Sequence, residues 1–225
     1  MEKLKIDILI PAYQEAGRIG RVVSEAKIYG HVWVVDDGST DSTAHEALSA
    51  GAEVIRQTQN QGKGSAVRSG LDTFLNGNAD AVILMDADGQ HDPREIPRFI
   101  EKAVQSGAWM VIGNRMEENQ KMPQVRKITN RVMSKILSMC SGVRVPDSQC
   151  GFRLIRREAV QRLNLHSSHF DIESELLLQT AAVTKKIENV RISTIYRGEK
   201  SKIHPLKDTI RFLKMMLIYL KPKFR

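Results

Sequence analysis

Cysteine is scarce in this sequence, because its 225 residues include two, Cys140 and Cys150. Two thiols cannot form a disulfide framework or a four-ligand zinc site, and we expect both to be small buried side chains. Long apolar runs are also lacking, since the longest stretch without a charged residue is 103–114, whereas a membrane-spanning helix needs about 20 apolar residues. The N-terminus lacks a signal-peptide layout, which predicts a reducing, cytoplasmic location.

The positive charge is unevenly distributed. Lysine and arginine number 34 against 26 acidic residues, so the formal charge is +8. Residues 121–162 carry +8 and residues 199–225 carry +6, which leaves −6 on the rest of the chain. A basic chain suggests nucleic acid as partner, but no binding motif is recognisable and aromatic residues make up 5% of the chain. We therefore expect no nucleic-acid partner.

Short β-branched runs alternate with helical patterns in the first half of the chain. This alternation predicts an α/β fold, with a Rossmann-like, mostly parallel sheet flanked by helices. Strands are predicted at 6–10, 32–35, 53–56, 81–85, 109–112 and 187–192. Helices are predicted at 15–27, 65–75, 126–140, 171–184 and 206–220. Two further helices are predicted, one that is capped by Ser39 or Thr40 and ends at residue 49, and one that starts at Pro93. Since no linker or repeat interrupts the pattern, we expect one domain over residues 1–225.

Polar clusters follow three predicted strands, at the strand ends where open α/β sheets bind ligands. The clusters are Pro11-Ala12-Tyr13-Gln14-Glu15, Asp36-Asp37-Gly38-Ser39 and Asp86-Ala87-Asp88-Gly89-Gln90. An Asp-Gly pair after one strand is typical of a turn, but three such clusters predict a ligand site.

The third cluster is the strongest of these signals. Asp86 and Asp88 concentrate negative charge directly after an apolar run, and their oxygens suit Mg²⁺ or Mn²⁺ that shares its other ligands with phosphates. A calcium loop is excluded because no glutamate closes a 12-residue loop. The neighbouring His91 is either a ligand or, more commonly for a lone histidine, a hydrogen-bonding neighbour.

A glycine-containing loop, Asn60-Gln61-Gly62-Lys63-Gly64, precedes a predicted helix. Such a loop could bring backbone N–H groups and the Lys63 ammonium to a phosphate. It has neither the Walker spacing nor the dinucleotide pattern Gly-x-Gly-x-x-Gly.

Together these motifs resemble those of family 2 glycosyltransferases with the GT-A fold, in particular the polyprenyl-phosphate sugar transferases that include dolichol-phosphate mannose and glucose synthases. The matching segments occur in family order. They are Pro11-x-Tyr13-x-Glu15, Asp36-Asp37-Gly38-Ser39-x-Asp41, Asn60-x-Gly62-Lys63-Gly64, Asp86-Ala87-Asp88-x-Gln90-His91, Gly113-x-Arg115 and Asp147-x-x-Cys150-Gly151-Phe152-Arg153, with a later match at Arg197…Ser201-Lys202.

The resemblance implies a metal-dependent, inverting transferase that moves a hexose, mannose or glucose, from a UDP- or GDP-sugar to dolichyl or polyprenyl phosphate. Residues 1–120 would then bind the nucleotide-sugar and the metal, residues 121–202 the acceptor, and residues 203–225 would form a C-terminal amphipathic helix.

The resemblance also implies roles for individual residues. The donor would be bound by Pro11, Tyr13, Glu15, Asp37, Lys63 and Asp86. The metal, Mg²⁺ or Mn²⁺, would be held by Asp86, Asp88 and Gln90. The phosphates on the acceptor side would be bound by Arg115, Arg126, Arg197 and Lys202. The expected catalytic residues are Asp88, Arg115 and Arg126.

The nature of the acceptor decides whether a general base is needed. A lipid monophosphate is anionic at neutral pH and needs arginines rather than a base, whereas a sugar hydroxyl needs a carboxylate. We expect direct in-line displacement without a covalent enzyme intermediate. The alternative is a sugar-hydroxyl acceptor with Asp147 or Glu175 as base. Glu173 and Glu175 could also be a helix-start charge cluster.

A nucleotidyltransferase is a second alternative with an α/β nucleotide-binding fold. The sequence does not support it, because the usual Gly-rich, Arg-containing segment after the first strand is absent.

The basic segments suggest a membrane surface as partner. Lys127, Arg131 and Lys135 predict a charged, solvated helix face. In the C-terminal helix, a stripe of cations lies beside apolar side chains, so this helix either lies at a membrane interface or packs on its own domain. The cations are Lys207, Arg211, Lys214 and Lys221, and the apolar side chains include Ile210, Phe212, Leu213, Met215, Met216, Leu217, Tyr219 and Leu220. A transferase that uses a lipid phosphate as acceptor but has no membrane-spanning helix needs another way to reach the membrane. We expect peripheral contact with the cytoplasmic membrane face or a membrane partner subunit.

Overall fold

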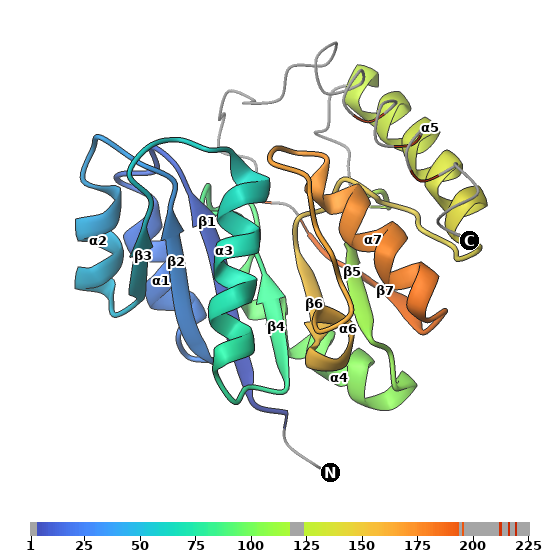
Figure 1. The fold of residues 1–225 in the computed structure, drawn as a ribbon, viewed down its shortest axis with the longest axis horizontal. Coiled ribbons are helices and arrows are strands. Elements are labelled where there is room, and N and C mark those ends of the chain that lie inside the picture. The colour runs from blue at the N-terminus through green and yellow to red at the C-terminus, as the bar shows by residue number, and fades with distance from the viewer. Residues whose placement is uncertain are drawn as a thin grey trace.

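The computed structural model contains a seven-stranded sheet covered by helices on both faces (Figure 1). It describes residues 4–117, 124–193, 195, 212, 216 and 219, without the side chain of Arg126. The strands are β1 (Ile6–Ala12), β2 (His31–Asp36), β3 (Glu53–Arg56), β4 (Ala81–Leu84), β5 (Met110–Asn114), β6 (Arg153–Arg156) and β7 (Ile187–Arg191). The helices are α1 (Ile19–Ala26), α2 (Thr43–Ala50), α3 (Lys63–Asn76), η1 (Pro93–Glu95), α4 (Ile96–Ser106), α5 (Gln124–Ser141), α6 (Arg157–Val160) and α7 (Ile172–Val183).

The strand order is β3-β2-β1-β4-β6-β5-β7. Every pairing is parallel except those of β6, which runs antiparallel to β4 and β5. The prediction of a mostly parallel sheet is confirmed, and all four residues of β4 are buried, as expected for a strand covered on both faces. Strand β6 and helix α6 were not predicted, because arginines on both sides of Leu154-Ile155 leave no apolar run there.

Two predicted helix starts differ from the structure. The helix predicted from residue 15 begins at Ile19, after Gly17 with its φ of +79°. The cap predicted at Ser39 or Thr40 is wrong, because α2 begins at Thr43. The Ser39 hydroxyl instead accepts a hydrogen bond from the Gln14 backbone N–H at 2.9 Å, so it joins the loops after β1 and β2.

Three residues of the predicted C-terminal helix are described, and they are helical. Phe212 and Met216 are buried, and the Tyr219 hydroxyl donates to Glu175 of α7 at 2.9 Å. Of the two alternatives for this helix, packing on the domain therefore holds for these side chains. The four cations assigned to its stripe lie outside the described residues. No helix in the described part of the chain is both long and apolar enough to cross a membrane.

The cysteines occupy different environments. Cys150 is buried, as predicted, and burial raises the pKa of its thiol to about 12. Cys140 was expected to be buried too, but it is exposed near the C-terminal end of α5.

The guanidinium of Arg157 joins the start of α6, directly after β6, to the C-terminal end of α3. It donates to the backbone carbonyls of Phe74, Leu75, Gly77 and Ala79, at distances between 2.7 and 3.2 Å. The last carbonyls of a helix have no partner within the helix, so a cation at this position satisfies them. Arg157 thereby fixes the antiparallel strand β6 against α3.

We predict that Arg157→Ala lowers the free energy of unfolding by about 2 kcal/mol, because several carbonyls lose their donor. Denaturant unfolding followed by circular dichroism measures this loss. The control is Arg162→Ala, whose guanidinium stacks on Trp109 at 4.7 Å and is not held by such a carbonyl cluster. We expect it to cost less than about 1 kcal/mol. Equal losses in the two variants would contradict the role assigned to Arg157.

Candidate active site

The predicted donor-binding residues lie around the carboxyl ends of β1, β2 and β4. Tyr13 is 39% exposed, whereas Glu15 and Asp37 are buried. The backbone N–H of Glu15 donates to the Thr43 hydroxyl at 2.8 Å, so the loop after β1 is attached to the start of α2. Because β1 pairs in parallel with both β2 and β4, the three strand-end clusters lie at one edge of the sheet, as the sequence predicted.

Asp37 shapes the glycine loop that follows β3. Its Oδ1 accepts from the backbone N–H of Gln61 at 2.7 Å, and its Oδ2 accepts from that of Gly62 at 2.8 Å. A carboxylate that accepts two backbone N–H groups fixes the path of the loop. A contact of Asp37 with a nucleotide stays an expectation from the resemblance.

The interpretation of the glycine loop as a backbone cradle for phosphate is not supported by the structure. The N–H groups of Gly64 and Ser65 donate to the carbonyl of Ser168, in the segment before α7. That segment packs so closely that a Cβ on Gly62 would lie 2.3 Å from the Ser168 carbonyl oxygen, and one on Gly64 would lie 2.4 Å from that of Ser167. The glycines are therefore needed for contact with a distant segment, which a local motif does not reveal.

Lys63 joins three elements of the site. Its Nζ lies 2.5 Å from Oδ1 of Asp86, in the loop after β4, and 2.6 Å from Oε1 of Glu173, in α7. Burial alone would lower the pKa of Lys63, but the two carboxylates outweigh it and raise this pKa above its usual value. The ammonium is therefore permanently charged.

The two aspartates of the third cluster differ in charge environment. Burial would raise the pKa of Asp86, but Lys63 holds it below its usual value. Burial raises the pKa of Asp88 to about 6, and the charge of Asp86 adds to this shift. Asp88 thus carries negative charge that its protein neighbours do not fully compensate, which favours a cation at this place.

His91 is a hydrogen-bonding neighbour, as expected for a lone histidine. Its Nδ1 accepts from the backbone N–H of Asp86 at 3.1 Å, and its ring stacks on Phe152. Burial lowers the pKa of His91 to about 4, so the ring is neutral at pH 7. It supports the loop that carries Asp86.

The residues present fit a divalent cation that is shared with a substrate. Within the described ranges, no group of three or more His, Cys, Asp or Glu side chains could enclose a metal ion. Asp86 and Asp88 offer two carboxylates, and the Gln90 backbone N–H orients Asp88 by donating to it at 2.9 Å. Few protein oxygens and an excess of negative charge are typical of Mg²⁺ or Mn²⁺ sites completed by phosphate.

The chain returns to this loop after β7. The backbone N–H of Ile195 donates to the Gln90 carbonyl at 3.0 Å, and the Ser193 hydroxyl donates to Glu95 at 3.2 Å. Ile195 precedes the predicted phosphate-binding Arg197 by two residues. Arg197 and Lys202 themselves lie outside the described residues.

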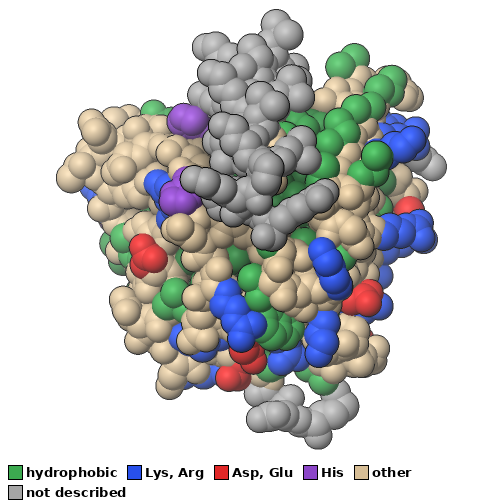
Figure 2. Space-filling model, turned by 45° about the vertical axis from the view of Figure 1, so that its right-hand side comes forward, with side chains coloured by type: hydrophobic (Ala, Val, Ile, Leu, Met, Phe, Trp, Pro, Cys, Tyr) green, Lys and Arg blue, Asp and Glu red, His purple; other side chains and the backbone are tan. Residues whose placement is uncertain are grey.

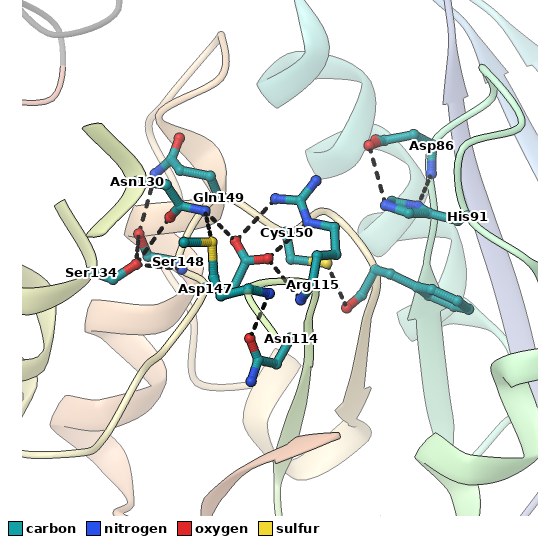
Figure 3. Close-up of polar contacts among 12 residues, drawn as sticks. Asp86, His91, Asn114, Arg115, Asn130, Ser134, Asp147, Ser148, Gln149 and Cys150 are labelled. Atoms are coloured by element: carbon teal, nitrogen blue, oxygen red, sulfur yellow. Dashed lines mark hydrogen bonds and ion pairs between the residues drawn. The ribbon is translucent and has the colours of Figure 1, made fainter. Parts of the chain in front are cut away.

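Arg115 and Asp147 form the centre of a second network, next to the first (Figure 3). Nε of Arg115 donates to Oδ2 of Asp147 at 2.7 Å and Nη2 donates to Oδ1 at 3.0 Å. The side chains of Asn130 and Ser134, on α5, extend the network to Asp147 and Ser148. The guanidinium beside Asp147 holds the pKa of this buried carboxyl below its usual value, although burial itself acts in the opposite direction. Arg126 lies in the first turns of α5, and its side chain is outside the described part.

Both carboxylates considered as general bases have structural partners. Asp147 is paired with Arg115, as described above. Glu175 accepts from the backbone N–H groups of His166 and Ser167 at 2.8–3.1 Å, and from the hydroxyl of Tyr219. The charge cluster at the start of α7 is therefore internal to the fold, and Glu175 holds the segment that packs on the glycine loop.

Two buried residues near Lys63 and Arg115 had no role predicted from the sequence. Glu173 was noted without a firm role, yet it pairs with Lys63. Arg153 is fully buried, and it donates to the backbone carbonyls of Cys150, Ser148 and Glu173. The available signal was the arginine that ends the motif Cys150-Gly151-Phe152-Arg153, since a buried arginine needs several acceptors.

We predict that Asp147→Asn lowers the free energy of unfolding by about 3 kcal/mol at pH 7, because it leaves Arg115 without its anionic partner. The pKa of Asp147 is lowered by folding, so its contribution is present above its unfolded pKa of about 3.9 and is lost as the pH falls through the lower folded value. The difference in the free energy of unfolding between wild type and variant should therefore become smaller below about pH 4. Urea unfolding at several pH values measures this difference.

The control for this prediction is Asp72→Asn, which changes an exposed carboxylate on α3. It should shift stability by less than about 0.5 kcal/mol. A gap for Asp147→Asn that is below 1 kcal/mol at neutral pH, or that does not shrink in acid, argues against the ion pair as the stabilising contact.

Comparison with known proteins agrees with this architecture. The chain is 31% identical to a UDP-N-acetylglucosamine–dolichyl-phosphate N-acetylglucosaminyltransferase of Methanococcus voltae, over 85% of this chain and 86% of the relative. It is 30% identical to an undecaprenyl-phosphate mannosyltransferase of Micrococcus luteus, over 86% and 85% of the two chains.

A solved structure shares the fold. Glucosyl-3-phosphoglycerate synthase of Mycobacterium tuberculosis, crystallised with Mn²⁺, UDP-glucose and phosphoglyceric acid, superposes with a TM-score of 0.75 at 20% identity, over 98% of this chain and 80% of that one. The predicted GT-A fold is thus confirmed. Residues 7–163 match the sequence profile of glycosyl transferase family 2. The chain therefore belongs to glycosyl transferase family 2, and it resembles the polyprenyl-phosphate sugar transferases within that family.

Proposed function

We propose that this glycosyltransferase moves a hexose from a UDP- or GDP-sugar to dolichyl or another polyprenyl phosphate, with inversion and with the help of Mg²⁺ or Mn²⁺. The observation that carries the acceptor assignment is the pairing of Arg115 with Asp147. This pairing fixes the orientation of a guanidinium that would bind a phosphate. It also occupies Asp147, and the backbone N–H of Ser167 occupies Glu175, so both proposed bases are bound to structural partners. A phosphate acceptor needs no base, whereas a sugar hydroxyl does.

The donor side follows from the Asp86–Gln90 loop. Asp86, Asp88 and Gln90 would hold the divalent cation, which supplies Lewis-acid stabilisation of the charge on the departing diphosphate. Pro11, Tyr13, Glu15 and Asp37 would contact the nucleoside, since they surround the carboxyl ends of β1 and β2. Lys63 would contribute its positive charge to the donor phosphates while it orients Asp86.

The acceptor side follows from Arg115 and α5. Asp147 takes the Nε and Nη2 groups of Arg115. The outer nitrogens of this guanidinium, with Arg126, would bind the lipid phosphate and direct one oxygen to the anomeric carbon. Attack from the side opposite the leaving diphosphate inverts that carbon. We assign Arg197 and Lys202 to the same phosphates, because the segment before Arg197 is hydrogen-bonded to the metal-binding loop.

Helix α5 supports a peripheral contact with the membrane. Asn130 and Ser134 lie on its buried face, within the Arg115–Asp147 network. Its opposite face carries an exposed apolar stripe of Val125, Ile128, Val132 and Met139, which are 52–75% exposed.

Basic residues accompany this stripe. Arg131 and Lys135 are exposed beside it, and Figure 2 shows hydrophobic and basic side chains next to one another on the side of the molecule that carries α5. An apolar stripe with flanking cations suits an anionic bilayer surface. We therefore assign the acceptor to a membrane and place the protein on its cytoplasmic face, alone or with a membrane partner subunit.

Donor binding is tested by thermal shift. With Mn²⁺, we expect at least one of UDP-glucose, UDP-N-acetylglucosamine, GDP-mannose and GDP-glucose to stabilise the wild type. Ligand at 100 times Kd adds about 2.7 kcal/mol, which corresponds to a rise in Tm of roughly 5–10 °C. Asp88→Asn should lose most of this rise, because it removes a negative charge from the metal site, whereas Asp72→Asn should respond like the wild type. If no donor stabilises the wild type, or Asp88→Asn responds like it, the proposed metal role is wrong.

The acceptor and the membrane contact are tested in one transfer assay. We expect sugar transfer to polyprenyl phosphate in anionic vesicles, and none to free sugars or phosphoglycerate. Ile128→Ser combined with Val132→Ser should lower the rate on vesicles roughly tenfold, because two apolar contacts with the bilayer are lost. The rate with a short, water-soluble prenyl phosphate should be unchanged.

The matched control is Ile28→Ser combined with Leu48→Ser. These two side chains are also exposed, at 76% and 57%, but Ile28 lies after α1 and Leu48 lies on α2. This double variant should keep the vesicle rate. Transfer to a free sugar would favour the alternative with a carboxylate base, and equal losses in both double variants would remove α5 from the membrane contact.

A further inference from the structure

The ammonium of Lys63 is shared between two carboxylates of different kinds. Asp86 is a proposed metal ligand, whereas Glu173 lies behind it, at the start of α7. The distances from Nζ are 2.5 Å to Asp86 and 2.6 Å to Glu173, so neither contact dominates. The side chain of Glu173 is 8% exposed, against 29% for Asp86. Asp86 therefore faces the site and Glu173 faces the interior.

The orientation of Glu173 is fixed from its backbone. The buried guanidinium of Arg153 donates to the Glu173 carbonyl, and Glu173 lies in the first turn of α7, where a negative charge is favoured by the helix dipole. Its second oxygen, Oε2, is buried and accepts no hydrogen bond from the described residues. Lys63 is thus the cation toward which this carboxylate is directed.

Asp86 is confined on another side by Gly151. A Cβ at this position would lie 2.9 Å from both carboxylate oxygens of Asp86 and 3.1 Å from Nζ of Lys63. The backbone of the segment before β6 therefore packs directly on the ion pair, and Asp86 has little freedom to move away from Lys63.

A cation that binds Asp86 competes with Lys63 for the same charge. If Lys63 paired with Asp86 alone, the ammonium would neutralise this carboxylate and weaken its attraction for a metal ion. Glu173 draws the ammonium in the opposite direction and restores one negative charge to the group. The triad of one lysine and two acids has a net charge of −1, whereas the pair Lys63–Asp86 alone has none.

We propose that Glu173 is a positioning residue of the donor site: by sharing the Lys63 ammonium with Asp86, it leaves one net negative charge on the Lys63–Asp86–Glu173 group to attract the divalent cation. The proposal rests on the metal-dependent function proposed above. Glu173 does not touch the substrate in this scheme, and its effect on the metal passes through Lys63.

The test is direct titration of Mn²⁺, with free Mn²⁺ measured from its electron paramagnetic resonance signal, on the folded full chain with saturating UDP and, in parallel, GDP. In Glu173→Gln, the charge is lost and the side-chain size is kept. We expect the Mn²⁺ concentration for half-saturation to rise about tenfold, because a unit charge is removed next to the ion pair in a buried setting. Glu173→Asp keeps the charge at a longer distance from Lys63, and a rise of about two- to threefold is expected.

The matched control is Asp7→Asn, which also converts a buried carboxylate to its amide. Asp7 lies at the opposite end of β1 from Pro11 and accepts from the Trp33 ring N–H. Its Mn²⁺ titration should equal that of the wild type even if its Tm falls, so the comparison separates a role in metal binding from a role in stability.

The outcomes distinguish the two levels of the argument. If the wild type binds no Mn²⁺ with either nucleotide, the proposed metal-dependent function fails. If the wild type binds Mn²⁺ and Glu173→Gln binds it equally well, the function stands and the positioning role is overturned. Should Glu173→Gln not fold, Glu173→Asp decides, since unchanged Mn²⁺ binding in that variant also overturns the role of Glu173.

Discussion

The buried ion pairs of Lys63 hold the candidate site together. The Lys63 ammonium lies between Asp86 and Glu173, and it joins the start of α3, the loop after β4 and the first turn of α7. A buried charge is tolerated only where opposite charges and hydrogen bonds compensate it, so these three segments must meet at one point. The backbone of Gly151 closes the same point from the direction of β6. The ion pairs therefore hold these segments together and set the charge at this edge of the sheet.

A second buried pair, Arg115–Asp147, organises the other half of the site. It connects β5 with the segment before β6, and Asn130 extends it into α5. One face of α5 takes part in this network, while the other presents an exposed apolar stripe. The helix therefore connects the buried Arg115–Asp147 pair to an apolar part of the protein surface.

Local signals predicted much of this molecule. The apolar runs, the positions of the aspartates and the order of the motifs depend on near neighbours in the chain, and the resemblance to family 2 transferases rests on them. The role of His91 as a hydrogen-bonding neighbour was also predicted, because this is the common role of a lone histidine. Helix starts were less accurate where a hydroxyl, such as that of Ser39, had a partner in another loop.

The fold class and the sheet edge at which the polar clusters meet follow from the amino-acid sequence, because periodicity and strand ends are local features. Which charges pair with one another depends on the assembled fold. The insertion of β6 between β4 and β5, the Ser168 carbonyl on the N-terminus of α3 and the contact of Glu173 with Lys63 all join segments far apart in the chain. Such contacts leave no local pattern, since each partner satisfies a need for charge or hydrogen bonding that arises only when the sheet has assembled.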